Sequence, residues 1–390
     1  MVPDPGLNDP NGSSGGPAAP QPSQPGTPLA GPEYGGPAYP AQYPPAQYPA
    51  AYSAVPFPPG YQAGPPPKPS ALPVAQREYH EFFRAPRFRW WKPLAAIGMF
   101  AASAFLVILL LTPIIFIDVA NGRIDLGKLT SGEIPTTPLL FLVNNLGLAV
   151  WVPLAGLTAW AVFGQRPRWL SSIAGGFRWR LFGRFALIAF VVLAISTGAD
   201  IAFSGGVDGL AWNSDSLFLI VTIVLTTPFQ SAGEEYALRG LGARAIGSWF
   251  GWRRAGLAVA TAVTSVIFML LHGAGDPWLN AFYLLFAVLS SVLVWRTGGL
   301  EASVALHVCN NLISEATLPF SPIEGIFDRH AGVAGPETLW QMAAIVIVAA
   351  LMLWQARRLK LPRTAAPAAP NPTVPSAPGG VFWNSSHTIA

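Results

Sequence analysis

Eight apolar stretches, each long enough to cross a lipid bilayer, constrain this chain more than any other feature of its sequence. A helix needs about 20 mostly apolar residues to cross the hydrocarbon core of a membrane. The stretches lie near residues 94–117, 138–163, 185–203, 216–238, 255–275, 278–295, 299–318 and 338–356. Only 11% of the residues are charged and 52% are hydrophobic, a balance typical of a membrane protein. The sequence therefore predicts an all-α fold, a polytopic transmembrane helical bundle of about eight helices.

The positions of the basic residues predict how this bundle lies in the membrane. They cluster before the first stretch, between the second and third, between the fourth and fifth, and after the eighth, at Arg84, Arg87, Arg89, Lys92, Arg166, Arg168, Arg178, Arg180, Arg184, Arg244, Arg253, Arg254, Arg357, Arg358 and Lys360. All four clusters fall on the same side, and loops rich in Lys and Arg stay in the cytoplasm. We therefore expect a multi-pass protein of the cell (plasma) membrane with both termini cytoplasmic.

Composition also limits the function classes. A net charge of +4, spread around membrane spans, gives no support to nucleic-acid binding, so we expect the lipid bilayer and no nucleic acid as partner. Cys309 is the single cysteine, which excludes an intrachain disulfide and a zinc cluster of cysteines.

Two proline-rich segments flank the apolar region. Residues 1–80 hold more than half of the 40 prolines, and residues 361–390 are rich in Pro and Ala. Such segments bury too little apolar surface to offset their ordering entropy, so we expect disordered cytoplasmic tails. We interpret the first as a solvated tether, with docking of a partner on its Pro/Tyr-rich repeats as the alternative.

A few ionisable residues interrupt the apolar stretches, and such residues are functional candidates by default. They are Glu234, Glu235 and Arg239 at the end of the fourth stretch, His272 at the end of the fifth, and His307 with Asn311 in the seventh. On a helix Glu235 and Arg239 are one turn apart and can pair, which leaves Glu234 as the unpaired carboxylate.

This set suits hydrolysis of an amide bond. A glutamate in a dry cavity can take a proton from water, and His and Asn side chains can donate hydrogen bonds to the oxyanion. Alternatively Glu234, His272 and His307 could bind a divalent metal such as zinc with an open position for water. The two histidines lack the local spacing of a His-Glu-x-x-His site, so we favour a mechanism without a cofactor. Each residue also has a structural explanation, as an interfacial charge or as an interhelical hydrogen-bonding group.

The expected depth of His272 in the membrane differs from that of Glu234 and His307. Glu234 and His307 are expected in the cytoplasmic half of the bilayer, whereas His272 follows Arg254 by about 18 residues and is expected near the far side at roughly 1.5 Å per residue. Either residues 241–254 are not a simple loop, or the helices are tilted or offset. The catalytic hypothesis requires that the three residues converge.

Three motifs resemble those of a known family. Glu234-Glu235-Tyr-Ala-Leu-Arg239 resembles EExxxR, Phe268-Met-Leu-Leu-His272 resembles FxxxH, and His307-Val-Cys-Asn-Asn311 resembles HxxxN, the motifs of the CAAX-protease and bacteriocin-processing membrane enzymes. This is the Abi, or type II CAAX prenyl endopeptidase, family. The similarity covers about residues 90–358 and is strongest over 215–315, so we expect one membrane protease-like domain between the tails.

The resemblance implies an eight-helix intramembrane protease. Glu234 would activate water, Glu235 and Arg239 would support it, and His272, His307 and Asn311 would position the water or hold the oxyanion. The substrate would be a membrane-embedded or lipidated protein or peptide; prenylated CAAX proteins are substrates of the eukaryotic branch, but the Pro-rich amino terminus here looks bacterial.

Two other classes of function compete with the endopeptidase. The first is a non-catalytic membrane scaffold or regulator, in which the polar residues only lock helices together. The second is a transporter, which we rank below it because broken helices in paired repeats are not evident. Convergence of Glu234, His272 and His307 on a water-accessible cavity would favour the enzyme, and a path open to both sides would favour transport.

Overall fold

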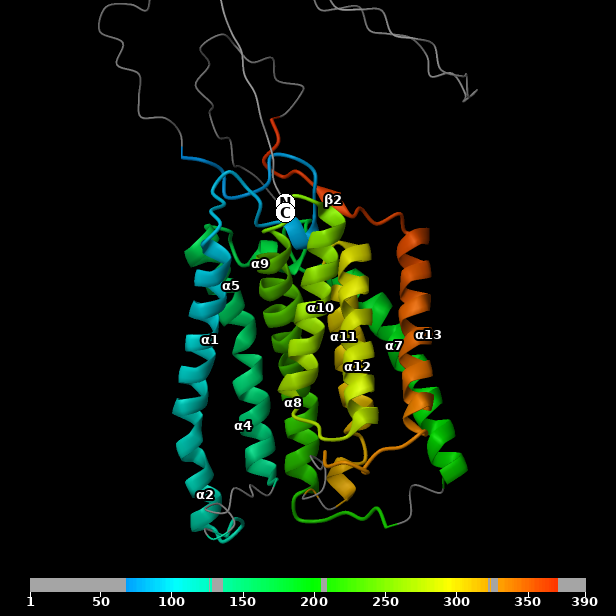
Figure 1. Cartoon of the computed structure of the whole chain (residues 1–390). Coiled ribbons are helices and arrows are strands. Elements are labelled where there is room, and N and C mark those ends of the chain that lie inside the picture. The colour runs from blue at the N-terminus through cyan, green and yellow to red at the C-terminus, as the bar shows by residue number, and fades with distance from the viewer. Residues whose placement is uncertain are drawn as a thin grey trace, which may run out of the picture. The chain divides into compact units, whose positions relative to one another are not determined.

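The computed structural model describes residues 68–125, 127, 136–204, 209–321, 323 and 329–370. In chain order its elements are β1 (Arg77–Glu78), η1 (Tyr79–Glu81), α1 (Lys92–Leu111), η2 (Thr112–Ile114), α2 (Ile115–Ala120), α4 (Pro138–Ala149), α5 (Trp151–Phe163), α6 (Arg168–Ser171), α7 (Trp179–Ser204), α8 (Ser216–Glu235), η3 (Tyr236–Gly242), α9 (Ala243–Gly247), α10 (Arg253–Leu271), α11 (Pro277–Thr297), α12 (Glu301–Ser314), η4 (Leu318–Phe320), α13 (Thr338–Arg358) and β2 (Thr364–Ala365). The long helices run side by side, and their connections lie at two ends (Figure 1).

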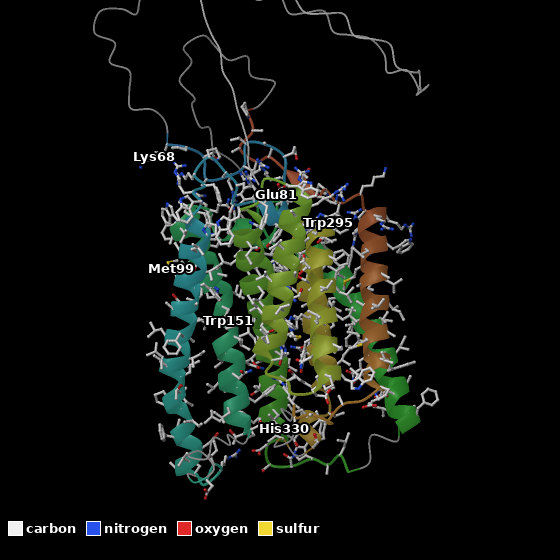
Figure 2. All side chains as sticks on the ribbon, viewed as in Figure 1. Lys68, Glu81, Met99, Trp151, Trp295 and His330 are labelled. Carbon is white, nitrogen blue, oxygen red and sulfur yellow. The ribbon has the colours of Figure 1, made fainter. Side chains whose placement is uncertain are left out.

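We name these ends by their residues. The tail end carries residues 68–91, the loops at 164–178, 248–252 and 298–300, and residues 359–370, whereas the far end carries α2, η4 and the start of α13 (Figure 1). Lys68 and His330 mark the tail end and the far end respectively in Figure 2.

The predicted membrane bundle is confirmed. Among the described residues seven helical segments are long and apolar enough to cross a bilayer: Lys92–Ala120, Pro138–Phe163, Trp179–Phe203, Ser216–Gly247, Arg253–Leu271, Pro277–Thr297 and Thr338–Arg358. Their outward faces are apolar, as on α1, where Phe105, Leu106 and Leu110 are exposed. Side chains of this kind on a surface are typical of contact with lipid.

The stretch predicted at 299–318 differs from the other seven. It forms α12, which has only 14 residues, and every residue from Glu301 to Cys309 is buried. α12 packs against α7, α8 and α11, so it is an interior helix of the bundle and contacts protein rather than lipid. An interior helix can carry polar residues that a lipid-facing helix cannot, which explains the weaker apolar character of its sequence.

The tail end fixes where α12 begins. Gly298 ends α11 with φ of 67°, a conformation that favours glycine. The backbone N–H of Leu300 then donates to the carbonyl of Ser171 at 2.8 Å. The carboxylate of Glu301 accepts from the guanidinium of Arg178 at 2.7 Å, and Glu301 is fully buried. These contacts set the height of His307, two turns further along α12.

Parts of both predicted tails belong to the folded domain. β1 pairs antiparallel with β2, with Arg77 opposite Ala365 and Glu78 opposite Thr364. Residues 68–80 and 361–370 therefore extend the folded domain beyond the expected limits of 90 and 358. The rest of the predicted tails, residues 1–67 and 371–390, lies outside the described residues.

Candidate active site

The two adjacent glutamates lie where α8 changes from an α-helix to a π-helix. α8 ends at Glu235, and η3 follows it without a break. Short π-helical turns are rare and frequently occur at functional sites. Gly233 allows a close approach to α4 at this point, because a Cβ there would collide with the carbonyl oxygen of Leu148. The glutamates thus lie on a widened turn that is packed closely against a neighbouring helix.

The helical run through η3 answers the question of depth that the sequence left open. α8, η3 and α9 form one segment from Ser216 to Gly247, so residues 241–254 are not a simple loop. Glu234 therefore lies roughly 20 Å from the tail end of this segment, at about 1.5 Å per residue. That depth brings Glu234 towards the level of His272, which directly follows α10.

Glu235 is held by two partners. Its Oε1 accepts from Nη1 of Arg239 at 2.9 Å and from Nδ1 of His307 at 3.0 Å. Glu235 and Arg239 are fully buried, and the guanidinium of Arg239 also lies over the ring of Phe268 at 4.5 Å. The predicted pairing of Glu235 with Arg239 is present, and it also orients the imidazole of His307.

Glu234 has a different environment. Its Oε1 accepts from Nε2 of Gln230 at 2.5 Å, and its Oε2 is 3.9 Å from Nε2 of His307. A separation of 3.9 Å is too long for a direct hydrogen bond, and a water molecule can bridge such a gap. Glu234 also lines the large cavity of the bundle. It is therefore the carboxylate of the pair that can meet a substrate.

His272 lies against two aromatic rings. Its Nδ1 donates to the carbonyl of Phe268 at 2.8 Å, since a carbonyl only accepts, and its ring stacks on Tyr283 with centroids 4.0 Å apart. The ring of Phe268 contacts both histidines, with centroids 4.5 Å from His272 and 5.8 Å from His307. The carbonyl of His272 accepts from Arg329. The imidazole of His272 is thus held through Nδ1, and its Nε2 takes no part in that hydrogen bond.

Asn311 is linked to Glu234 through the amide group of Gln230. Its Nδ2 donates to Oε1 of Gln230 at 3.1 Å and to Oγ of Ser231 at 3.2 Å. Because Gln230 in turn donates to Glu234, the three side chains form one chain of hydrogen bonds. Sequence reasoning missed Gln230, although a polar residue one helical turn before Glu234 was a usable signal.

A cavity of about 1080 Å³ opens in front of these groups. Glu234, His272 and Asn311 line it, whereas Glu235, Arg239 and His307 lie behind its wall. Amide side chains are numerous in the lining, namely Asn144, Asn145, Gln230, Asn310, Asn311 and Gln341. Between them lie apolar and aromatic groups, including Phe141, Trp151, Phe268, Phe282 and Trp340. The structure therefore brings the six predicted residues into one region and presents three of them to the cavity.

The alternative zinc site does not fit the geometry. Among the described residues, the histidine and acidic side chains whose ligand atoms all lie within 4.8 Å of one another are Glu78, His80 and Glu81 at the tail end. The ligand atoms of Glu234, His272 and His307 do not all lie within 4.8 Å of one another. We therefore derive no step through a metal at these three residues.

The tail end holds a second buried group of charged residues, which we call the tail-end cluster: Glu78, Tyr79, His80, Glu81, Arg244 and Arg253. Here Glu81 accepts from Nε of Arg253 at 2.9 Å, and the guanidinium of Arg244 lies over the ring of Tyr79 at 3.8 Å. Nε2 of His80 donates to the carbonyl of Arg253, and burial lowers the pKa of His80 below its usual range.

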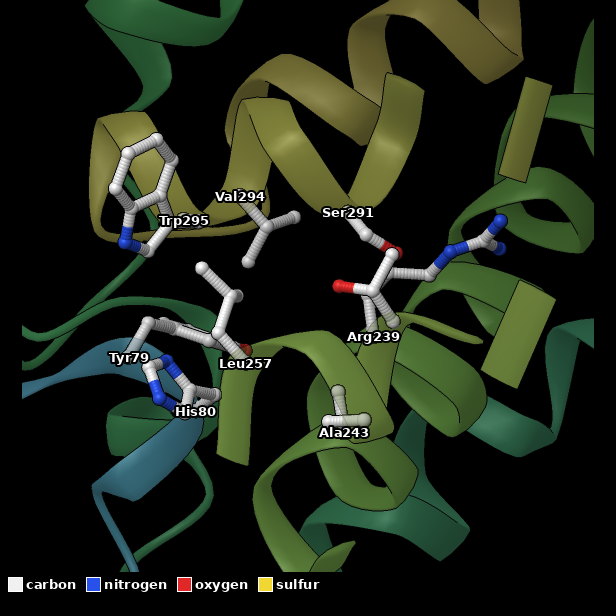
Figure 3. A pocket seen from close by; sticks show the side chains of 10 residues that line it. Tyr79, His80, Arg239, Ala243, Leu257, Ser291, Val294 and Trp295 are labelled. Carbon is white, nitrogen blue, oxygen red and sulfur yellow. The ribbon is translucent and has the colours of Figure 1, made fainter. Parts of the chain in front are cut away.

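The pocket at the tail-end cluster is small. It measures about 20 Å³, little more than one water molecule needs. Figure 3 shows the aliphatic part of Arg239 at this pocket, with its guanidinium directed away from Tyr79 and His80. The cluster is therefore closely packed and leaves no room for a peptide.

Comparisons with known proteins show what the central segment is similar to. Residues 213–313 match the family model described as Type II CAAX prenyl endopeptidase Rce1-like. "Uncharacterized protein YyaK" of Bacillus subtilis (strain 168) is 24% identical over 155 residues, which cover 37% of this chain and 50% of the relative. The chain thus matches about half the length of that relative, and no solved structure matches the chain. All six predicted site residues lie within the matched segment. The resemblance is thereby confirmed for this segment: residues 213–313 match the Rce1-like type II CAAX prenyl endopeptidase family model.

Proposed function

We propose that the protein is a membrane endopeptidase that hydrolyses a peptide bond of a membrane-embedded or lipidated protein or peptide. The observation that supports this most is the difference between two adjacent carboxylates. Glu235 is held by Arg239 and His307, whereas Glu234 faces the cavity with its Oε2 at 3.9 Å from His307. A buried carboxylate without a close ion pair, beside a cavity, is suited to act as a general base.

Glu234 would move the proton in both halves of the reaction. It takes a proton from water while the water oxygen bonds to the scissile carbonyl carbon. The same proton then passes to the leaving amide nitrogen as the carbon–nitrogen bond breaks, which yields a carboxylic acid and an amine. General acid–base catalysis of this kind contributes about 10²–10⁴-fold in rate.

The two histidines would help to position the attacking water from two sides. His307 donates through Nδ1 to Glu235, so its Nε2, 3.9 Å from Oε2 of Glu234, can accept from a water held between the two groups. His272 donates through Nδ1 to Phe268, so its Nε2 can accept a hydrogen bond from the attacking water.

Asn311 would act through its amide group. Its Nδ2 now donates to Gln230 and Ser231, and through Gln230 it positions Glu234. Since Asn311 lines the cavity, a substrate oxyanion can replace one of these two acceptors.

The competing functions make different predictions. A scaffold needs the same helix contacts but no cleavage. A transporter binds its substrate at a site that opens to the two ends in turn, and it needs no general base for water. The incompletely paired oxygen of Glu234 at the cavity wall therefore favours the endopeptidase over a transporter.

The test is cleavage of a library of fluorogenic membrane peptides by the purified full chain in detergent. We compare the wild type with Glu234→Gln, and with Glu337→Gln as a matched control, because Glu337 is exposed and outside the cavity. Glu234→Gln should lower kcat/KM at least about 100-fold. Glu337→Gln should leave it unchanged, and activity should survive a chelator.

Two results would contradict the proposal. Full activity of Glu234→Gln would remove the assigned base. No cleavage by a folded wild type on any peptide would favour the scaffold.

A further inference from the structure

The cavity extends from the site towards the far end of the bundle. Its lining includes residues at or near the far ends of four helices and of the segment before α13, namely Thr136, Asp200, Thr317, Arg329, Trp340 and Gln341. Several of these positions, among them Asp200, Trp340 and Gln341, are exposed. Figure 1 shows the corresponding helix ends, those of α4, α7 and α13, on the side away from β2. In the part of the chain that the structure describes, the cavity is therefore reached from the far end.

The tail end closes the opposite route. Behind Glu234 lie Glu235 and Arg239, both fully buried, and behind these the packed tail-end cluster. The route from the tail end to Glu234 is thus filled by side chains.

The two ends of the bundle differ in the charges of their described residues. The tail end carries the basic residues Arg84, Arg87, Arg89, Lys92, Arg166, Arg168, Arg178, Arg180, Arg253, Arg254, Arg357, Arg358, Lys360 and Arg363. The described part of the far end has Arg123 and Arg329 beside the acidic residues Asp118, Asp125, Asp200, Asp215, Asp276, Glu315 and Glu337. Basic ends stay in the cytoplasm, so the far end lies on the extracytoplasmic side.

The lining of the cavity fits an extended peptide. In the membrane every backbone N–H and C=O group needs a hydrogen-bonding partner. Six amide side chains, each with donor and acceptor groups, line this cavity. Asn144 and Gln341 are exposed there, whereas Asn145, Gln230, Asn310 and Asn311 also bond to neighbouring side chains. The aromatic and apolar groups between them suit the side chains of a membrane-associated segment.

From these observations we propose that the substrate is an extended segment on the extracytoplasmic side of a membrane-anchored polypeptide, which enters the cavity from the far end. The identity of the substrate rests on the proposed endopeptidase function, whereas the side from which the cavity is reached does not. A peptide presented at the cytoplasmic face would meet the closed tail end.

The first test measures the side of access without any assay of activity. Single cysteines are placed at the two ends of α13, Gln341→Cys in the cavity lining and Leu359→Cys at the tail end, both exposed positions. The background is Cys309→Ala, which removes the single native cysteine. Intact cells and inverted membrane vesicles are then treated with a membrane-impermeant maleimide.

Gln341→Cys should react in intact cells and lose its labelling in inverted vesicles, and Leu359→Cys should do the opposite. The reverse pattern would overturn the proposal, because the cavity would then face the cytoplasm. Labelling of Gln341→Cys only after detergent is added would also overturn it, because the cavity would be closed to the far end.

The second test measures the side of cleavage. A library peptide that the purified protein cleaves is placed next to a single transmembrane helix, on its extracytoplasmic side in one reporter and on its cytoplasmic side in the other. The reporter with the peptide on the extracytoplasmic side should be cleaved, and the reporter with the peptide on the cytoplasmic side should not. Cleavage of the cytoplasmic reporter alone, or of neither, would overturn the proposal while the endopeptidase stands. If the maleimide results are as expected but no library peptide is cleaved, the proposed endopeptidase function is contradicted and the proposed direction of access is still supported.

Discussion

The candidate active site and the tail-end cluster are made of the same kinds of residue, since both combine glutamates, histidine and arginine with aromatic rings in a buried setting. Both also contact the helical run from α8 to α9, from which Arg239 reaches the site and Arg244 reaches the tail-end cluster. Their surroundings differ. The site borders a cavity of about 1080 Å³, and the tail-end cluster borders one of about 20 Å³.

The carboxylates show what this difference means. In the tail-end cluster, Glu81 is engaged by Arg253 and Arg77 and accepts from the backbone of Glu78, so its oxygens are used in holding the structure. In the site, Glu234 keeps an oxygen without a close partner at the cavity wall. Burial and charge alone thus do not distinguish a reactive group from a structural one; the accessible, incompletely paired oxygen does.

The largest effect on stability is expected from Glu235→Gln. This change leaves Arg239 as a buried charge without its partner, which costs about 3–5 kcal/mol in the free energy of unfolding. Activity should fall as well, because His307 loses the carboxylate that orients it. The measurement is thermal unfolding in detergent beside Glu234→Gln, an identical change at the next residue, which should unfold at nearly the wild-type temperature. Equal unfolding temperatures for the two variants would show that the adjacent glutamates do not have separate roles.

Glu81→Gln tests the tail-end cluster in the same way. The expected loss in the free energy of unfolding is about 1–2 kcal/mol, because a charged hydrogen bond is weakened while Arg253, whose side chain is 44% exposed, remains solvated. The activity of the folded molecules should not change. The measurement pairs thermal unfolding with kcat/KM, and a specific loss of kcat would mean that the tail-end cluster takes part in the reaction.

Sequence reasoning predicted the bundle well because the length and hydropathy of a span are local properties. It failed at 299–318, since the burial of α12 depends on neighbours that come from distant parts of the chain. The six site residues could be named from their polarity in apolar surroundings and from the family motifs.

The depth of the site residues could not be predicted in the same way. The sequence shows no sign that α8 continues through a π-helix to Gly247, and this continuation brings Glu234 deep enough to share a cavity with His272. The roles of Gln230 and of the cavity depend on contacts between helices, which no local pattern records.

Phe268→Leu tests how the site is held together. The ring of Phe268 contacts His272, His307 and the guanidinium of Arg239, so its loss should displace all three and lower kcat/KM about tenfold. The free energy of unfolding should fall by about 1 kcal/mol. The matched control is Phe163→Leu, a buried residue of α5 whose ring stacks on Phe83 in a separate core cluster and does not line the cavity. If both variants lose activity in proportion to their stability, Phe268 is only a packing residue.

The smallest effect is expected at the far end, where the ion pair of Arg123 and Asp215 is exposed. Its atoms are 3.1 Å apart, and the side chains are 44% and 30% exposed. Solvent screens such a pair, so Arg123→Ala should lower the free energy of unfolding by no more than about 0.2–1 kcal/mol, and added salt should abolish the difference. Thermal unfolding at low and high ionic strength measures both quantities. A loss as large as that of Glu235→Gln, or one that salt does not change, would mean that the far end is held as rigidly as the site. Peptide entry would then require opening of a stable structure, whereas a small and salt-sensitive effect agrees with a cavity mouth held by weak contacts.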